Sequence, residues 1–239
     1  MIMKKNVLFF LLSTCLFLFF TIFSWSVKKG AFRNADFAFT VKVQETIDKS
    51  PRLRLSSFVG DVMEGSTFFA SPEVSVIAVL VLTIAAFFSL RCIDTSKWGV
   101  WKSLLKAGII LLMFLFLVLA EIYGKTVVHH PAPPFFMIKN PTSIFPKYYI
   151  NDEFSYPSGH AARAVFISII FSYLLFHTSY LKRKKRIAII VLFSLGYVGL
   201  VSVSRIYLGH HWLSDIIGGL ALGSGLASLT CAFFFRTDS

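Results

Sequence analysis

Cysteine and acidic residues are scarce in this sequence. Only 3 of its 239 residues are cysteine, and Cys15, Cys92 and Cys231 all lie in or beside apolar segments. Their spacing fits neither a zinc site nor a disulfide framework. Asp and Glu number 12, against 24 Lys and Arg, and the acidic residues form no cluster that indicates a metal site. We therefore expect neither a metal ion nor another cofactor.

Charge as a whole is also sparse, at 15% of the residues, whereas 56% are hydrophobic and 27 are phenylalanine. With a mean hydropathy of +0.71, this composition is typical of an integral membrane protein. The net charge of +12 would indicate a nucleic-acid partner in a soluble protein. Here the positive residues lie mainly between apolar segments, which favours contact with anionic lipid headgroups and excludes nucleic acid as the expected partner.

Six apolar segments are long enough to cross a bilayer as helices. They cover residues 6–25, 74–90, 104–123, 161–180, 187–203 and 212–235. The first has no small-residue cleavage site at its end, which favours an uncleaved helix over a signal peptide. The sequence predicts an all-α integral membrane protein, with six transmembrane helices in a bundle and a single domain over residues 1–239.

Two connections between these segments are long. The first contains residues 35–47, whose pattern favours an amphipathic interfacial helix, although a solvated connector fits it as well. The third runs over residues 124–159 and is rich in Pro, His and aromatic residues. We expect short interfacial helices in both connections.

The basic residues predict the orientation, because short cytoplasmic loops are enriched in Lys and Arg. Lys4 and Lys5 precede the first span, and the second and fourth connections carry further positive charge, including five consecutive basic residues at 182–186. The sequence thus predicts a multi-pass protein of the cell (inner or plasma) membrane with both termini in the cytoplasm. The third and fifth connections then meet on the outer face.

The fifth connection carries the first candidate catalytic residues. Arg205, His211 and Asp215 follow one another with five and three residues between them. If this stretch is helical, His211 and Asp215 share one face and can touch. A carboxylate that holds one imidazole nitrogen leaves the other free to react. Charged groups at the end of a span are costly, so we interpret them as functional.

Two other clusters are expected on the same face. Ser158, Gly159 and His160 open the fourth span, where a hydroxyl and backbone N–H groups at a helix N-terminus can bind an anion and His160 can donate a proton. Lys125 lies just outside the third span, where its ammonium group can reach the same anion. A site with two cations, two imidazoles and such donors suits a phosphoryl group, whose transfer depends mostly on charge stabilisation.

These clusters resemble the three signature motifs of the type 2 phosphatidic acid phosphatase superfamily, which includes bacterial membrane lipid phosphatases. The second motif, Pro-Ser-Gly-His, is intact at residues 157–160. The third is intact as Ser204, Arg205, His211 and Asp215. The order of the motifs, the six spans and the outward site match the bacterial members, and the resemblance covers roughly residues 74–235.

The resemblance implies a role for each motif residue. His211 is the expected nucleophile that forms a phosphohistidine, Asp215 holds its imidazole, and His160 protonates the leaving alkoxide and then activates water. The residues expected to bind the phosphate oxygens are Lys125, Ser158, Gly159 and Arg205.

The first motif departs from the family pattern, which is Lys, six residues, then Arg-Pro. Lys125 is present, but Ala132 stands where the family has arginine. Loss of such a charge-assisted contact costs on the order of 2–4 kcal/mol. His129, His130 or Arg163 are candidates to replace it in part. Otherwise the substrate carries fewer charges, or the protein is slow or inactive.

The expected function is removal of phosphate from a membrane lipid at the outer face. Candidate substrates are a polyprenyl diphosphate, phosphatidate and phosphatidylglycerol phosphate. A lipid phosphotransferase and a catalytically degenerate phospholipid-binding protein are the alternatives. A transporter is disfavoured, because the middles of the spans are nearly free of charge. The oligomeric state is left open by the sequence.

Overall fold

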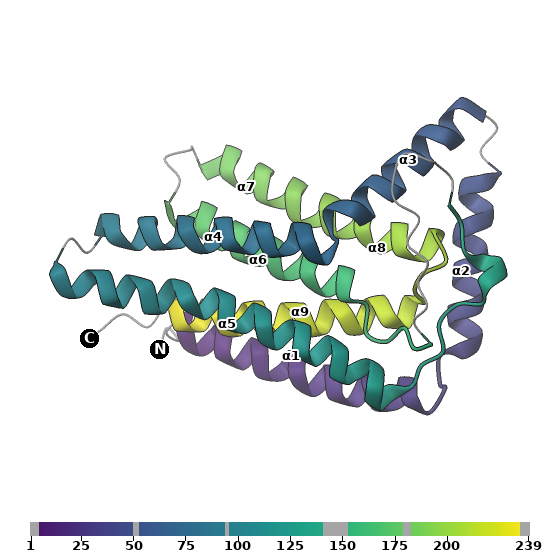
Figure 1. Cartoon of the computed structure of the whole chain (residues 1–239), viewed down its shortest axis with the longest axis horizontal. Coiled ribbons are helices and arrows are strands. Elements are labelled where there is room, and N and C mark those ends of the chain that lie inside the picture. The colour runs from purple at the N-terminus through teal and green to yellow at the C-terminus, as the bar shows by residue number, and fades with distance from the viewer. Residues whose placement is uncertain (1–4, 50–52, 94–95, 141–152, 179–182, 235–239) are drawn as a thin grey trace.

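The computed structural model of the chain describes residues 5–49, 53–93, 96–140, 153–178 and 183–234. Six helical segments of this described part are long and apolar enough to cross a membrane, which confirms the predicted all-α membrane architecture. They are α1 (Lys5–Lys28), α4 (Pro72–Ile93), α5 (Lys97–Val128), α6 (Gly159–Thr178), the run formed by α7 (Arg183–Val191), η2 (Leu192–Tyr197) and α8 (Val198–Tyr207), and α9 (Leu213–Phe234) (Figure 1).

Helix α5 is longer than the predicted span of residues 104–123. Its N-terminus is capped by Ser96, whose side-chain oxygen accepts a hydrogen bond of 2.9 Å from the backbone N–H of Gly99. At the other end His129 adopts a left-handed conformation with φ of 53°, which terminates the helix. Lys125 therefore lies in the last helical turn, so the helix continues past the predicted span and holds the backbone of Lys125.

The fifth span also extends beyond its predicted limits of residues 187–203. It contains one segment of π-helix, η2, between α7 and α8, and the helix continues to Tyr207. Arg205 consequently lies in the last turn of α8, where the helix holds its backbone.

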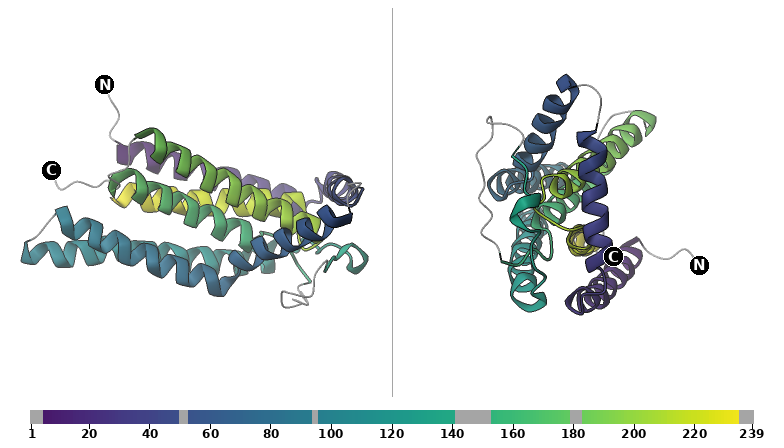
Figure 2. Two further views of the ribbon diagram at one scale, coloured as in Figure 1. Left: turned by 90° about the horizontal axis from the view of Figure 1, so that it is seen from above. Right: turned by 90° about the vertical axis from the view of Figure 1, so that its right-hand side faces the viewer.

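The first connection forms two helices at one end of the bundle. Helix α2 (Arg33–Asp48) runs across this end, and α3 (Leu53–Phe69) leads back to α4 and packs against α8 (Figures 1 and 2). A helix at residues 35–47 was predicted and is confirmed. In the described part of the third connection the helical structure is a single 3-10 turn, η1 (Phe135–Met137). The rest of that connection, residues 141–152, lies outside the described residues.

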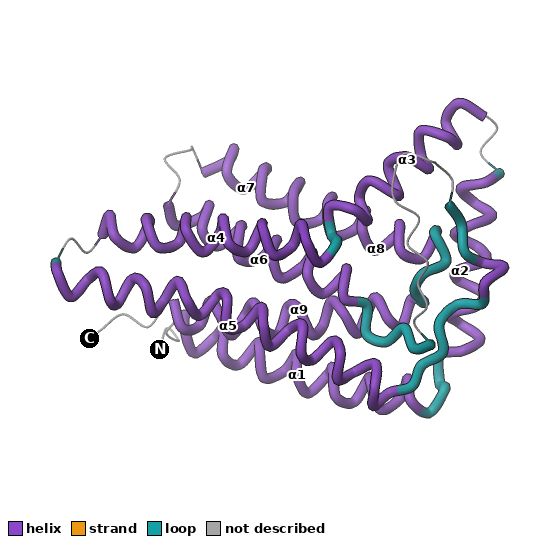
Figure 3. The backbone as a smooth tube through the Cα atoms, viewed as in Figure 1, coloured by secondary structure: helices purple, strands orange, loops and turns teal. Residues whose placement is uncertain are grey.

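The loops that lie close to α2 contain several of the candidate site residues. Figure 3 shows the described part of the third connection and the turn between α8 and α9 together at this end. Helix α1 begins, and α9 ends, at the opposite end of the bundle (Figure 1). The candidate motif residues therefore lie at the end of the bundle remote from both terminal helix ends.

Helix α9 is the most buried of the six spans and packs against both α1 and α6 (Figure 1). Its glycines allow the close approach of α6. A β-carbon at Gly219 would overlap the carbonyl oxygen of Ser158, just before α6 begins. This approach lets the backbone N–H of Ser158 donate a hydrogen bond of 3.0 Å to the carbonyl oxygen of Asp215. The packing of α6 on α9 thus joins the second motif to the third.

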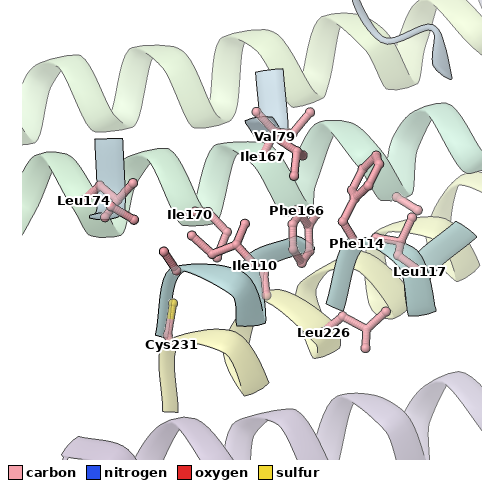
Figure 4. Packing of buried hydrophobic residues seen from close by; sticks show 14 of the residues in the cluster. Val79, Ile110, Phe114, Leu117, Phe166, Ile167, Ile170, Leu174, Leu226 and Cys231 are labelled. Atoms are coloured by element: carbon pink, nitrogen blue, oxygen red, sulfur yellow. The ribbon is translucent and has the colours of Figure 1, made fainter. Parts of the chain in front are cut away.

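An apolar core fills the middle of the bundle between α4, α5, α6 and α9. The rings of Phe114 and Phe166 lie with their centroids 5.9 Å apart, Leu226 lies beneath them, and Ile170 and Cys231 continue the cluster toward the other end (Figure 4). Burial of such side chains contributes about 1.5–3 kcal/mol each in water, and in lipid their close packing stabilises the contact between helices. The core separates the polar end of the bundle from the end at which the basic connections lie.

The close contact at Gly219 predicts the effect of a single methyl group. Gly219→Ala is expected to lower the free energy of unfolding by about 1–3 kcal/mol, because the β-carbon has to displace backbone. Thermal unfolding in detergent measures this. The matched control is Gly108→Ala in α5, where no atom lies within 4 Å of the new β-carbon. That variant should be at least as stable as the native chain, and equal losses in both variants would contradict the packing argument.

Candidate active site

A cavity of about 300 Å³ opens among helices at the polar end of the bundle. Four of the residues predicted to act together, Lys125, His160, Arg205 and His211, line it. They come from α5, α6, α8 and the turn before α9. The complete lining is Thr67, Ser71, Pro72, Glu73, Glu121, Lys125, His160, Arg163, Arg205 and His211.

The turn after α8 places His211 beside Arg205. The backbone carbonyl oxygen of Arg205 accepts hydrogen bonds from the N–H groups of His210 at 3.0 Å and His211 at 3.2 Å. Both histidines are buried. Burial lowers the pKa of His211, and the nearby charges of Arg205 and Lys125 lower it further, against the opposing effect of Asp215. His211 is therefore a neutral imidazole at neutral pH, the form that can act as a nucleophile.

Asp215 holds the turn that carries His211. One of its carboxylate oxygens, Oδ2, accepts a hydrogen bond of 2.8 Å from the backbone N–H of Trp212. The same oxygen lies 3.5 Å from Nδ1 of His211. Because α9 begins only at Leu213, His211 precedes the helix, so the condition of a helical stretch from His211 to Asp215 is not met. The contact depends instead on the capping turn, and it still directs Nδ1 toward the carboxylate and leaves Nε2 of His211 for the cavity.

A second histidine makes the shorter contact with Asp215. Nδ1 of His130 lies 2.9 Å from Oδ1 of Asp215, at hydrogen-bond distance, and His130 is buried. An ionised carboxylate can only accept, so the imidazole donates. His130 was considered as a partner for the substrate, but the structure places it behind Asp215, away from the cavity lining. His129 is exposed and packs edge-on against Phe154, with ring centroids 4.8 Å apart.

Asp36 of α2 supports the same region and was not identified from the sequence. Its two carboxylate oxygens accept hydrogen bonds of 2.8 Å from the backbone N–H and the hydroxyl group of Ser214, at the start of α9. Oδ2 of Asp36 also lies 3.9 Å from Nε2 of His130. Burial raises the pKa of Asp36, although its bonds to Ser214 oppose the shift. The sequence offers one signal for Asp36. It lies four residues before Thr40, so both polar side chains lie on the same face of α2, and both are buried.

Ser158 and Gly159 lie at the start of α6 but do not line the cavity. The hydroxyl group of Ser158 is buried and has no hydrogen-bond partner among the described residues. Directly over Gly159 lies the carboxylate of Glu121, with which a β-carbon at position 159 would overlap. Oε2 of Glu121 lies 2.5 Å from Nη1 of Arg163, and Oε1 lies 3.9 Å from Nζ of Lys125. The anion-binding end of α6 is therefore covered by a carboxylate of the protein itself.

Ala132 does not line the cavity that contains His211. It lines a neighbouring cavity of about 410 Å³ together with Asp36, His130 and Trp212, whereas none of the residues of the first cavity lines this one. The position at which the family has arginine thus adjoins the support of Asp215 and does not adjoin the cavity of His211.

Cationic side chains and two imidazoles around one cavity can bind and transfer a phosphoryl group, and the cavity lies at one end of a membrane-spanning bundle. The fold and the site together define a membrane phosphatase. The model of the PAP2 superfamily matches residues 103–238, more than half of the chain, and the chain belongs to this superfamily. The resemblance seen in the motifs is thereby confirmed.

Two relatives cover nearly the whole chain. Phosphatidylglycerophosphatase B of Bacillus subtilis is 27% identical over 220 residues, which are 91% of this chain and 92% of the relative. The crystal structure of a transmembrane PAP2-type phosphatidylglycerolphosphate phosphatase from Bacillus subtilis is similar in fold, with a TM-score of 0.67 and 25% identity. The match covers 97% of this chain and 96% of that one. The similarity therefore extends beyond the motifs to α1 and the first connection.

The two adjacent histidines allow a matched test of the support of Asp215. His130→Ala leaves the buried Oδ1 of Asp215 without its donor, which is expected to lower the free energy of unfolding by about 1–3 kcal/mol. His129→Ala removes an exposed ring that contacts Phe154 and leaves Asp215 paired, so it should lower the free energy of unfolding by no more than about 1 kcal/mol. Thermal unfolding of both variants in detergent compares them. Equal stabilities would show that the His130 contact does not support Asp215.

Proposed function

We propose that this protein hydrolyses the phosphomonoester or diphosphate headgroup of a membrane lipid through a phosphohistidine on His211. The observation that supports the proposal most strongly is that a neutral His211, whose Nδ1 lies 3.5 Å from Oδ2 of Asp215, shares a cavity with Arg205, Lys125 and His160. This set contains a nucleophile, cations for the phosphate oxygens, and a separate acid and base.

The first chemical step transfers the phosphoryl group to the enzyme. The lone pair of Nε2 of His211 forms a bond to phosphorus while the P–O bond to the lipid breaks. Protonated His160 donates its proton to the departing oxygen, so the leaving group departs as an alcohol, or as a lipid monophosphate if the substrate is a diphosphate. Asp215 stabilises the positive charge that develops on the imidazole of His211.

The second step restores the enzyme. Neutral His160 takes a proton from water, the water oxygen attacks phosphorus, and the P–N bond breaks. Inorganic phosphate is released, and both histidines return to their starting protonation states. In both steps Arg205 and Lys125 neutralise the equatorial oxygens. Ser158 and Gly159 become further donors only where the carboxylate of Glu121 leaves the start of α6. Because side chains provide this charge, we propose that the reaction needs no metal ion.

Phosphatidylglycerol phosphate is the substrate that the relatives favour, since both Bacillus subtilis proteins are named as phosphatases of that lipid phosphate. Polyprenyl diphosphate and phosphatidate remain candidate substrates. An apolar groove of about 480 Å³ supports a lipid with a hydrocarbon chain. Ser66 and Phe69 of α3 line the groove, and Thr67 between them lines the catalytic cavity, so the two adjoin along α3. A lipid phosphotransferase would use the same phosphohistidine with an alcohol in place of water.

We propose that the cavity faces outward. The basic connections, with Arg91 at the end of α4 and Arg183 at the start of α7, lie at the end of the bundle opposite α2 (Figure 1). Basic residues favour the cytoplasm. The cavity at the α2 end is then extracytoplasmic, and both termini are cytoplasmic.

A phospholipid-binding protein without turnover is the second candidate. It is favoured by one observation, which is that Ala132 replaces the arginine of the first motif. Binding alone, however, requires neither a nucleophile nor a separate acid, and both histidines are present in the cavity.

Substitution of the nucleophile distinguishes the two candidates. His211→Ala is expected to abolish release of inorganic phosphate from phosphatidylglycerol phosphate, because it removes the imidazole that is proposed to accept the phosphoryl group. A decrease of at least about 10⁴-fold is consistent with loss of a nucleophile. Phosphate is measured with the purified protein in detergent, with polyprenyl diphosphate and phosphatidate offered in parallel.

The control is His129→Ala, which removes an exposed histidine that does not line the cavity and should leave release unchanged. EDTA should likewise leave release unchanged. Release that survives in His211→Ala would refute the mechanism, and complete inhibition by EDTA would refute metal independence. Absence of release from the native chain, with activity in Ala132→Arg, would favour the degenerate binding protein.

A further inference from the structure

The catalytic cavity contains a cation that the family motifs do not specify. Arg163 lies on α6 one turn after His160 and lines the same cavity as Lys125, Arg205 and His211. Its residue exposure is only 3%. Ala132, where the motif has arginine, lines the other cavity. A guanidinium group is therefore present at the site, but it comes from α6 and not from the third connection.

The donors of Arg163 are only partly used. Nη1 lies 2.5 Å from Oε2 of Glu121, whereas Nε is buried and has no hydrogen-bond partner among the described residues. A guanidinium group has five N–H donors in a planar fork that fits the oxygens of a phosphate two at a time. A buried N–H donor without an acceptor lowers stability. An anion bound in the cavity would supply an acceptor for the Nε–H of Arg163.

The partner of Arg163 occupies a place suited to that anion. The carboxylate of Glu121 lies against Gly159, the first residue of α6, where the positive end of the helix dipole favours negative charge. It contacts Arg163 and lies 3.9 Å from the ammonium group of Lys125. Three features that would bind a substrate phosphate, the helix N-terminus, Arg163 and Lys125, therefore converge on one carboxylate of the protein.

We propose that Arg163 is a substrate phosphate-binding residue that replaces the arginine missing at position 132, and that Glu121 holds its place until the lipid phosphate displaces it. This inference rests on the proposed function and names a further residue of the same site. Exchange of a carboxylate for a phosphate keeps the buried guanidinium group paired throughout. Glu121, displaced, remains within the cavity that Lys125 and Arg163 line.

A purely structural pair is the competing interpretation, since a buried ion pair between α5 and α6 can serve only to hold the helices. The two interpretations differ in what an added anion does. A structural pair is indifferent to a phosphate analogue, whereas a displaced Glu121 competes with it and Arg163 binds it.

Binding of orthovanadate, a phosphate analogue, to the purified full chain tests the proposal without requiring turnover. Isothermal titration compares the native chain with Glu121→Gln, Arg163→Gln and the double variant. Glu121→Gln removes the competing charge and should tighten vanadate binding by about three- to tenfold. Arg163→Gln should weaken it by about tenfold or more, as expected for loss of a charge-assisted contact. The double variant should stay weak, because the ligand for the anion is gone.

The double variant separates the two roles. If Arg163 serves only to neutralise the charge of Glu121, the double variant should bind vanadate with native affinity. This result would overturn the proposal. Unchanged affinity in Arg163→Gln, with only a lower unfolding temperature, also overturns it. If Arg163→Gln does not fold, Arg163→Lys keeps a charge for Glu121 without the planar fork and should still bind vanadate more weakly. The matched control is Arg186→Gln on α7, outside the cavity lining, which should bind as the native chain does.

Phosphate binding by Arg163 and lipid phosphatase activity are tested separately. His211-dependent release of phosphate by the native chain, together with native vanadate affinity in Arg163→Gln, would leave the function standing and remove Arg163 from the site. Release that persists in His211→Ala would reject the function, whatever the vanadate affinities are.

Discussion

The arrangement of this site depends on one buried carboxylate. Asp215 is fully buried at the start of α9, and a charge in that position requires donors. It receives them from the backbone of Trp212 and from His130, and it also contacts His211. These partners lie in the third connection and in the turn before α9, so one charge brings separate segments together. Orientation of the candidate nucleophile is thus a consequence of how a buried charge is stabilised.

Helix α2 extends this support across the end of the bundle. Asp36 accepts both hydrogen bonds of Ser214 at the N-terminus of α9, where negative charge is favourable, and it lies near His130. Helix α2 of the first connection therefore supports the third motif through Asp36. The similarity to the Bacillus subtilis proteins likewise includes the first connection, although the matched family model begins at residue 103.

Periodicity and composition predicted the membrane class and the six apolar spans, and they gave a helix at residues 35–47 as one of two alternatives, because apolar length and amphipathic pattern are local properties. The motifs predicted that Lys125, His160, Arg205 and His211 share one cavity. The helix ends were less accurate: the Ser96 cap and the left-handed His129 set the limits of α5 and place Lys125 within it.

The contacts of Asp36, His130 and Glu121 were not predicted. Asp36 and Ser214 are 178 residues apart, and His130 and Asp215 are 85 apart. No local pattern encodes such pairs. Glu121 is an ordinary acidic residue near a helix end by sequence, and its meaning appears only when the folded chain places its carboxylate over Gly159. The sequence thus identified the groups that carry the chemistry, whereas the groups that position or mask them depend on tertiary packing.

The proposed mechanism depends on covalent phosphorylation of His211. The most direct measurement is to quench the reaction of the native protein with phosphate-labelled phosphatidylglycerol phosphate under alkaline conditions, which preserve phosphohistidine, and to locate the label by mass spectrometry. In His160→Ala the labelled protein should accumulate if loss of His160 slows hydrolysis of the phosphohistidine more than its formation. We expect the label on His211. A label on His160 or another residue, or phosphate release with no labelled protein at any time, would contradict the account.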